Sequence, residues 1–187
     1  MRIISGQFRS RRLASLKGDD IRPTSDRLRE TLFNVLTAGD PSALQGSVWL
    51  DLFAGTGAVG IEALSRGAAM AYFVDSSNVA TELIRRNVGP LQLTGKFQVL
   101  LQKAGRAISA LDRQQLKPDF IFLDPPYALR DAYQTTLTSL GNSLLIEKAL
   151  VIAEHEKKNN LGEEYEGLRR IRKLEQGDAA LSFYRRS

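Results

Sequence analysis

Short runs of apolar, β-branched and aromatic residues alternate along the middle of the chain with longer segments whose apolar positions recur at helical spacing. The short runs predict strands at residues 48–54, 70–75, 97–102, 120–124 and 149–154. The longer segments predict helices at residues 58–66, 77–88, 105–113 and 132–140. Glycines and prolines stand at the joins, as helix-ending and turn residues do. This alternation is typical of an α/β fold in which helices cover a mostly parallel sheet.

Different patterns flank this region. A serine at residue 25 can cap a helix that runs to about residue 38 and carries leucines on one face. The first twenty residues predict a short hairpin or arm. Residues 168–174 and 179–184 flank a Gln-Gly-Asp turn and predict an antiparallel strand pair that closes the sheet. We divide the chain into a basic N-terminal arm and helix, residues 1–40, and a main domain, residues 41–187.

The chain has 187 residues, of which 43% are hydrophobic and 25% charged, as expected for one globular domain with a small appendage. It contains no cysteine, which excludes disulfides, thiolate catalysis and sulfur-ligated zinc. Its single histidine, His155, argues against a multi-histidine metal site and against a Ser-His-Asp hydrolase, so we expect no metal. We expect His155 itself to lie at the surface, just beyond a strand.

No apolar run approaches the roughly 20 residues that span a bilayer, and the first residues lack the apolar core of a secretory signal. We therefore expect a cytoplasmic protein with no membrane partner. The net charge of +5 is uneven, because residues 1–30 carry +4, residues 31–156 carry −2 and residues 157–187 carry +3. The basic ends suggest an acidic partner such as a nucleic acid, although basic segments also occur as solvated surface.

The segment at residues 51–60 ends the first predicted strand and opens a helix, the position at which open α/β sheets bind nucleotides. Gly55 and Gly57 lack a Cβ and can adopt positive φ, so a ligand can approach the backbone of this glycine loop, residues 53–57. The amides that begin the following helix offer hydrogen-bond donors to the same ligand.

Two classes of cofactor fit the spacing of this loop. Gly55, Gly57 and Gly60 satisfy the dinucleotide pattern G-x-G-x-x-G, and Asp75 lies where a ribose-binding acid belongs in either class. Asp51 separates the two classes, because its carboxylate would repel a pyrophosphate but would pair with the α-ammonium group of S-adenosylmethionine. The sequence therefore favours S-adenosylmethionine over a nicotinamide dinucleotide.

A second motif, Asp124-Pro125-Pro126-Tyr127, follows the apolar strand at residues 120–124. The two prolines fix the backbone and remove two amide donors, which leaves rigid carbonyl acceptors. The Asp124 carboxylate and the Pro125 carbonyl could accept both hydrogens of a planar amino group and orient its nitrogen for methyl transfer, while Tyr127 could stack on the base. Guanine N2, adenine N6, cytosine N4 and a glutamine amide share this geometry.

Four blocks of this sequence resemble the small-subunit ribosomal RNA (guanine-N2)-methyltransferases, the RsmD-like family, and the likeness covers nearly the whole chain. The blocks are residues 2–6 with 11–13, residues 22–34, residues 51–67 and residues 124–127. The resemblance implies a Rossmann-like, S-adenosylmethionine-dependent methyltransferase fold that methylates the exocyclic N2 amine of one guanine in 16S rRNA, within a partly assembled small subunit. We expect a monomer.

The motifs and the resemblance together assign residues to three roles. Those assigned to the cofactor are Asp51, Phe53, Ala54, Gly55, Gly57, Asp75, Ser76 and Ala104. Those assigned to the target base and to catalysis are Asp124, Pro125, Pro126 and Tyr127. Those assigned to RNA are Arg9, Arg11, Arg12, Arg22, Arg27 and Arg29, because the guanidinium group matches phosphate oxygens. Arg22 or Thr24 could instead reach the cofactor. Ala104 departs from the Asn or Asp common in the family, so its amide or Gln102 would replace that contact.

Other functions stay open from the sequence alone. The proline turn suits methylation of DNA adenine N6 or of a protein glutamine as well as of guanine. An RNA-binding assembly factor could keep the fold without catalysis. A nicotinamide oxidoreductase would use the same glycines, but it leaves the proline turn unexplained.

Overall fold

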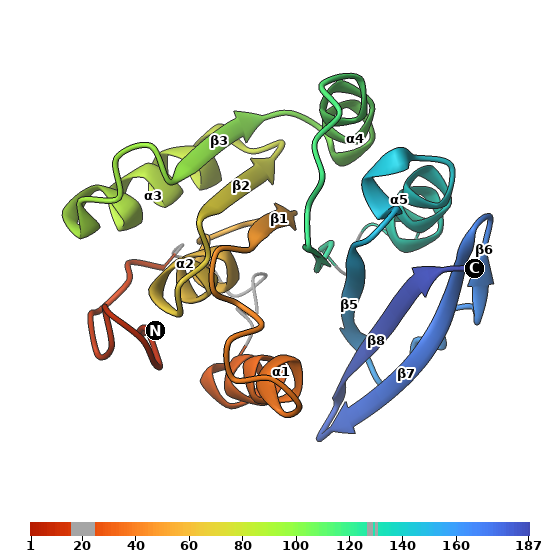
Figure 1. The fold of residues 1–187 in the computed structure, drawn as a ribbon, viewed down its shortest axis with the longest axis horizontal. Helices are drawn as coiled ribbons and strands as arrows, with labels where there is room; N and C mark the ends of the chain where they lie inside the picture. The colour runs from red at the N-terminus through yellow and green to blue at the C-terminus, as the bar shows by residue number, and fades with distance from the viewer. Residues whose placement is uncertain (16–24, 127–128, 130) are drawn as a thin grey trace.

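One mixed sheet forms the centre of the molecule, in a computed structural model that describes residues 1–15, 25–126, 129 and 131–187. Its strand order is β3-β2-β1-β4-β5-β8-β7-β6 (Figure 1). The five strands from β3 to β5 run parallel, and β8, β7 and β6 are antiparallel to their neighbours. The strands are β1 (Val48–Leu52), β2 (Met70–Asp75), β3 (Phe97–Leu101), β4 (Phe120–Leu123), β5 (Leu150–Glu156), β6 (Glu164–Tyr165), β7 (Leu168–Gln176) and β8 (Ala179–Arg186).

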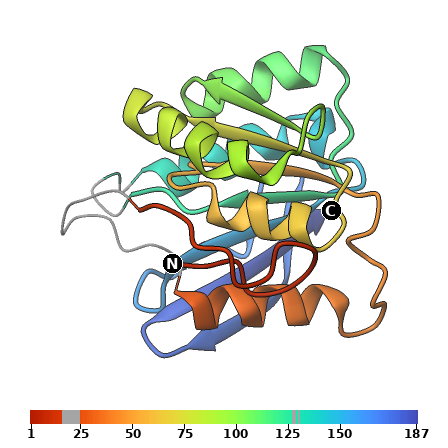
Figure 2. The ribbon, with the colours of Figure 1, turned by 90° about the vertical axis from the view of Figure 1, so that its left-hand side faces the viewer.

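Helices cover both faces of this sheet (Figures 1 and 2). One face packs its aromatic side chains, Trp49 and Phe73 among them, against α1, α2 and α3, and the other packs Leu52 and Leu123 against α4 and α5. Side chains alternate along a strand, so each buried strand serves both cores. Among the described helices, none is both long and apolar enough to cross a bilayer. The helices are α1 (Asp26–Thr37), α2 (Ala58–Ser65), α3 (Asn78–Val88), α4 (Ala104–Arg113) and α5 (Ala132–Gly141), with short 3₁₀ turns η1 (Gly89–Leu91) and η2 (Leu144–Ile146).

The predicted α/β fold class is confirmed, including the antiparallel pair near the C-terminus. Every predicted strand and helix of the main sheet is present with both ends within two residues of the prediction. β1 ends earlier than predicted, because Phe53 adopts a left-handed φ of 61° that no strand continues through. β6 was not predicted, since two residues show no periodicity. The division of the chain at residue 40 stays a prediction. Ile3 and Leu32, which precede residue 40, share one apolar cluster with Trp49, which follows it.

Residues 1–13 form a short hairpin that packs against α2, near the start of α1 (Figure 2). Both oxygens of the buried Glu62 carboxylate on α2 accept backbone amides of the hairpin, from Ile4 over 2.8 Å and from Ser5 over 2.9 Å. Gly6 approaches α2 so closely that an added Cβ would lie 1.9 Å from the Ser65 carbonyl oxygen. The hairpin is therefore an integral part of the fold.

His155 is buried, which corrects the expectation that it lies at the surface. Its Nε2 lies 2.9 Å from the Ser182 Oγ on β8, and its Nδ1 lies 2.8 Å from the Glu156 carbonyl oxygen. Burial lowers the pKa of the imidazole. The expectation failed because β5 continues past the predicted end and pairs there with β8.

Candidate cofactor and substrate site

The predicted acidic residues meet at the carboxyl edge of the parallel strands. Asp51 lies near the end of β1, Asp75 ends β2, and Asp124 directly follows β4. β1 pairs with both β2 and β4, with Leu52 opposite Val74 on one side and Leu123 on the other. The three loops that leave these strands therefore start side by side, where ligands bind in open α/β sheets.

The glycine loop is fixed to β2 by backbone and side-chain hydrogen bonds. Phe53, Gly55 and Gly57 have positive φ values of 61°, 54° and 76°, which turn the chain sharply between β1 and α2. The Ala54 amide donates to the Val74 carbonyl over 2.9 Å, and the Gly55 amide donates to the Asp75 Oδ2 over 2.9 Å. A non-glycine residue in the left-handed region is unusual, and Phe53 thus marks the loop as a constrained feature.

The three glycines of this segment have different roles. A Cβ added to Gly55 would meet one atom within 4 Å apart from its chain neighbours, the Phe53 carbonyl oxygen at 4.0 Å, so the space above Gly55 is open. A Cβ on Gly57 would lie 3.2 Å from Ile84, and one on Gly60 would lie 2.4 Å from the ring of Phe73. Gly57 and Gly60 therefore allow close packing, whereas Gly55 leaves backbone accessible to a ligand.

Asp51 is a buried carboxyl group, 2% exposed, at the base of the loop. Its Oδ2 accepts the Gly60 amide over 3.0 Å, which ties β1 to the first turn of α2. Burial raises the pKa of Asp51 to about 8, against the lowering effect of this hydrogen bond, and the nearby acids Asp75 and Glu154 raise it further. A cation placed beside Asp51 would offset both the cost of burying its negative charge and the repulsion from the nearby acids. The site therefore fits a positively charged ligand better than a pyrophosphate.

Asp75 anchors the loops on both sides of it. Its Oδ2 accepts the Gly55 amide, and its Oδ1 accepts the Ser77 amide over 2.8 Å. Each carboxylate oxygen keeps a second lone pair, so this arrangement leaves acceptor capacity for ribose hydroxyls. Ser76 is exposed. Ala104 is buried at the first position of α4, the helix that follows the next loop along this edge. The assignment of these residues to a cofactor stays a prediction.

Asp124 lies among acids at the end of β4. Since Leu123 pairs with Ala153, the following residues, Asp124 and Glu154, come at the same level on neighbouring strands. Burial raises the pKa of Asp124 well above its usual value, and the charges of Glu154 and Asp51 raise it further. Sequence reasoning missed Glu154, although an acid at the end of a predicted apolar strand, beside a predicted site, was the available signal.

The proline turn is described up to Pro126. Pro125 is buried and Pro126 is exposed, and the Pro126 carbonyl accepts the Leu129 amide over 2.9 Å, so that carbonyl already has a donor within the turn. Tyr127, predicted to stack on the base, lies outside the described residues, as do Arg22 and Thr24. Their predicted roles stay predictions.

Five of the six arginines predicted to bind RNA are described by the structure, four of them exposed and one buried. Arg9, Arg11, Arg12 and Arg27 are exposed. Arg11 donates to the Pro90 carbonyl over 3.0 Å and lies over the Phe8 ring. An RNA role for these residues is compatible with their exposure and stays a prediction.

Arg29 is fully buried, 0% exposed, which corrects its assignment to RNA. Its Nη2 donates to the Arg2 carbonyl over 2.6 Å and to the Asp26 Oδ1 over 2.9 Å, and its Nε lies 3.9 Å from the Glu62 Oε2. The assignment failed because the hairpin and α2 enclose the Arg29 side chain, which an isolated α1 would expose. Arg29 instead joins α1 to the hairpin and to α2.

Known proteins match this chain over most of its length. A family model described as "Conserved hypothetical protein 95" matches residues 1–185. "Putative rRNA methyltransferase YlbH" of Bacillus subtilis is 35% identical over 187 residues, covering 100% of this chain and 99% of that protein. "Ribosomal RNA small subunit methyltransferase D" of Escherichia coli K12 is 36% identical over 162 residues, covering 86% of this chain and 77% of that protein. The solved structure "Putative methyltransferase yhhF from Escherichia coli" has a TM-score of 0.82 and 32% identity, covering 100% of this chain and 98% of that chain.

Proposed function

Because this chain belongs to the family of the ribosomal RNA small subunit methyltransferase D proteins, we propose that it transfers a methyl group from S-adenosylmethionine to the exocyclic N2 amine of a guanine in 16S rRNA. One observation carries the proposal beyond family membership. Asp51, buried near the end of β1, and Asp124, half-buried just after β4, lie at the same edge of neighbouring parallel strands, so a donor held at the first would lie next to an amine held at the second.

The glycine loop and its neighbours suit the proposed cofactor. Asp51 would pair with the α-ammonium group, Gly55 would admit the chain of the cofactor to the backbone, and Asp75 would accept the ribose hydroxyls. Phe53, Ala54 and Ser76, in the loops that follow β1 and β2, would border the cofactor, and Ala104 at the start of α4 would present its backbone to the adenine. When bound, S-adenosylmethionine supplies an electrophilic methyl group on a positively charged sulfur.

Asp124 and the proline turn would orient the accepting nitrogen. The lone pair of guanine N2 is delocalised into the ring, so the free amine is a weak nucleophile. The Asp124 carboxylate and the Pro125 carbonyl would accept the two N–H groups, turn the lone pair toward the methyl group, and stabilise the positive charge that grows on nitrogen. The raised pKa of Asp124 favours its protonated form in the free protein, and the positive sulfur of a bound cofactor would favour the carboxylate, which can then take up the proton that the nitrogen loses.

RNA would approach over the arm, where the exposed Arg9, Arg11, Arg12 and Arg27 offer phosphate contacts. We propose as substrate 16S rRNA in a partly assembled small subunit, bound by a monomeric enzyme in the cytoplasm. We prefer guanine to adenine, to cytosine and to protein glutamine because four blocks of the sequence resemble the (guanine-N2)-methyltransferases, whereas the name of the matched relative specifies small-subunit rRNA alone.

The test uses purified protein, unmodified 16S rRNA and small subunits that lack the methyl mark. Wild type should form N2-methylguanine, detected by nucleoside mass spectrometry. Asp124→Ala should keep S-adenosylhomocysteine affinity within about threefold by calorimetry and lose at least about a hundredfold in methyl transfer. Asp178→Ala, a control in the exposed β7–β8 turn, should match wild type.

Full activity of Asp124→Ala would reject the assigned mechanism. A methyl group found on adenine, on cytosine or on a protein would reject the guanine assignment. Wild-type protein that binds the RNA but not S-adenosylhomocysteine would identify an assembly factor instead of an enzyme.

A further inference from the structure

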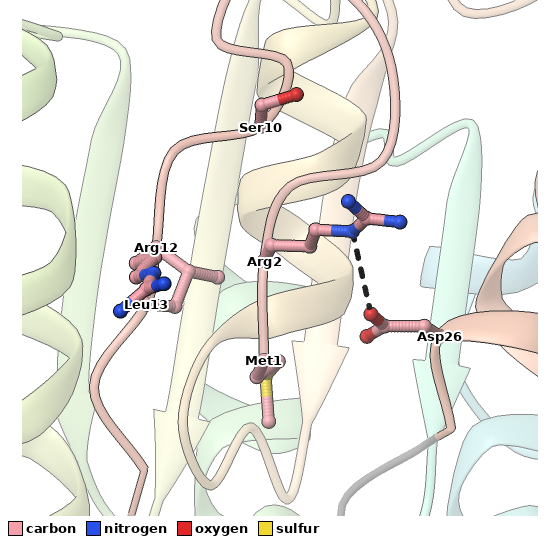
Figure 3. Close-up of a pocket in the computed structure, with 6 residues that line it drawn as sticks. All are labelled: Met1, Arg2, Ser10, Arg12, Leu13 and Asp26. Carbon is pink, nitrogen blue, oxygen red and sulfur yellow. Dashed lines mark ion pairs between the residues drawn. The ribbon is translucent and has the colours of Figure 1, made fainter.

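A cavity of about 500 Å³ opens between the hairpin and the start of α1. Its lining residues are Met1, Arg2, Ser10, Arg12, Leu13 and Asp26 (Figure 3). Figure 3 shows Arg2 and Arg12 on adjacent strands of the hairpin, with the Arg2 side chain turned toward Asp26. On the basis of the proposed RNA methyltransferase function, we propose that this arginine cavity binds one backbone phosphate of the RNA, held jointly by Arg2 and Arg12 beside the target nucleotide.

Arg2 and Arg12 occupy directly opposite positions on the two strands of the hairpin. Arg2 and Arg12 form an antiparallel bridge, flanked by hydrogen bonds from the Ile3 amide to the Arg11 carbonyl and from the Leu13 amide to the Met1 carbonyl. This is the non-hydrogen-bonded type of pair, in which opposing side chains lie closest. Like charges directly opposite each other destabilise a strand pair. A phosphate bound by both guanidinium groups would remove this repulsion.

The carboxylate at the cavity compensates the two arginines only in part. The Asp26 Oδ2 lies 3.9 Å from the Arg2 Nε, whereas the Asp26 Oδ1 accepts a 2.9 Å hydrogen bond from the buried Arg29. The Arg2 side chain remains 67% exposed. Within the part of the chain that the structure describes, Arg12 forms no ion pair. Asp26 thus serves mainly Arg29, and the cavity keeps a net positive charge.

The backbone beneath the pair is held in place before any ligand binds. The buried Arg29 donates a hydrogen bond to the Arg2 carbonyl over 2.6 Å. Further along the same strand, the Glu62 carboxylate accepts the amides of Ile4 and Ser5. Fixing the backbone in advance lowers the entropy cost of binding, which leaves only the ends of the arginine side chains to be ordered.

The arginine cavity also lies next to the glycine loop. Met1, one of its lining residues, places its Sδ 3.6 Å from the Oγ1 of Thr56, which stands between Gly55 and Gly57. A phosphate in the cavity would therefore lie close to the proposed cofactor site. This position suits the phosphate that adjoins the reacting nucleotide, because that phosphate has to lie close to the methyl donor.

The experiment measures binding of unmodified 16S rRNA to Arg2→Ala, to Arg12→Ala and to the double variant at several salt concentrations. Each single variant should weaken binding about tenfold at roughly 0.1 M salt and lower the slope of log affinity against log salt by about one. The double variant should lose less than the product of the two single losses, because both side chains hold the same phosphate. Arg113→Ala, which removes an exposed charge from α4 on the opposite face of the sheet, should leave affinity and slope unchanged.

Wild-type affinity and slope in both single variants would overturn the proposal, and so would losses that multiply in the double variant. S-adenosylhomocysteine binding and thermal melting are measured on every variant. A matching loss of S-adenosylhomocysteine affinity would assign the arginines to the cofactor and overturn the phosphate site. If the variants behave as predicted while wild type forms no N2-methylguanine, the phosphate site stands and the proposed function fails.

Discussion

The Asn87 side-chain amide donates a 2.9 Å hydrogen bond to the carbonyl of Thr56, in the middle of the glycine loop. The same side chain exchanges two hydrogen bonds with the backbone of Ala14, at 2.9 Å and 3.1 Å, just beyond the hairpin. Asn87 is 7% exposed. One buried side chain on α3 therefore holds together the proposed cofactor loop and the segment that carries the proposed RNA-binding arginines.

Replacing Asn87 should weaken both the loop and the arm. Asn87→Ala leaves the Thr56 carbonyl and the Ala14 amide without their partner, which should cost about 1–3 kcal/mol of unfolding free energy per unsatisfied group. S-adenosylhomocysteine affinity should fall with it, because the loop loses its fixed carbonyl. Chemical denaturation and calorimetry measure the two effects. Asn160→Ala, at an exposed asparagine between β5 and β6, should change neither.

Glu62 should be required for the hairpin to dock. Its carboxylate accepts the amides of Ile4 and Ser5 and the Nε of Arg66, all within 2.9 Å. Glu62→Ala leaves two partly buried amides without their acceptor and removes one of the two carboxylates beside the fully buried Arg29, so we expect a loss of about 3–5 kcal/mol in unfolding free energy. Hydrogen exchange should show faster exchange of the amides in residues 3–8, and unchanged protection there would contradict this role.

Two glycine-to-alanine changes in helices should have opposite effects on the stability of the protein. Gly60→Ala puts a Cβ 2.4 Å from the Phe73 ring, which forces α2 off the sheet and should destabilise the protein by about 1–3 kcal/mol. Gly105→Ala in α4 meets no atom within 4 Å and should stabilise it by up to about 1 kcal/mol through helix propensity. Thermal melting of the two variants without cofactor compares them directly. Equal effects would refute close packing at Gly60.

Stability of the free protein should fall as pH rises toward 8. Asp51 has a pKa of 3.8 in the unfolded reference and about 8 in the folded protein, so between these values the folded state binds a proton that the unfolded chain does not. The stabilisation is complete below about pH 4 and is lost as pH rises through about 8. Asp124, with its pKa also raised, contributes in the same direction.

Melting temperatures of wild type and of Asp51→Asn, taken from about pH 6 to about pH 9, test this dependence. The wild-type curve should decline, and the variant should decline less because, of these two carboxyls, only Asp124 still titrates. S-adenosylhomocysteine carries the α-ammonium group, so it should stabilise wild type more at the higher pH. A wild-type melting temperature that rises with pH would contradict the assigned burial of Asp51.

The strands and the site edge were predictable because they rest on local signals. β4 reads as an unbroken apolar run, and a motif that directly follows such a strand must lie at the carboxyl edge of a parallel sheet. Asp51, Asp75 and Asp124 were located by that rule alone. Their proximity needed the strand order, which the resemblance to a known fold supplied.

The buried polar residues were not predictable, because their environment comes from distant parts of the chain. Arg29 is enclosed by Arg2, on the hairpin, and by Glu62, on α2. His155 is covered by Ser182 on β8. Arginine and histidine are usually exposed, and a periodicity argument treats them as surface residues unless a tertiary partner is known.

The most direct measurement of the central claim is the methylation state of guanines in 16S rRNA from cells that lack this gene. One N2-methylguanine should disappear from the deletion strain, and a copy of the wild-type gene should restore it, while a copy encoding Asp124→Ala should not. An unchanged set of N2-methylguanines in the deletion strain, or full restoration by the Asp124→Ala copy, would contradict the account.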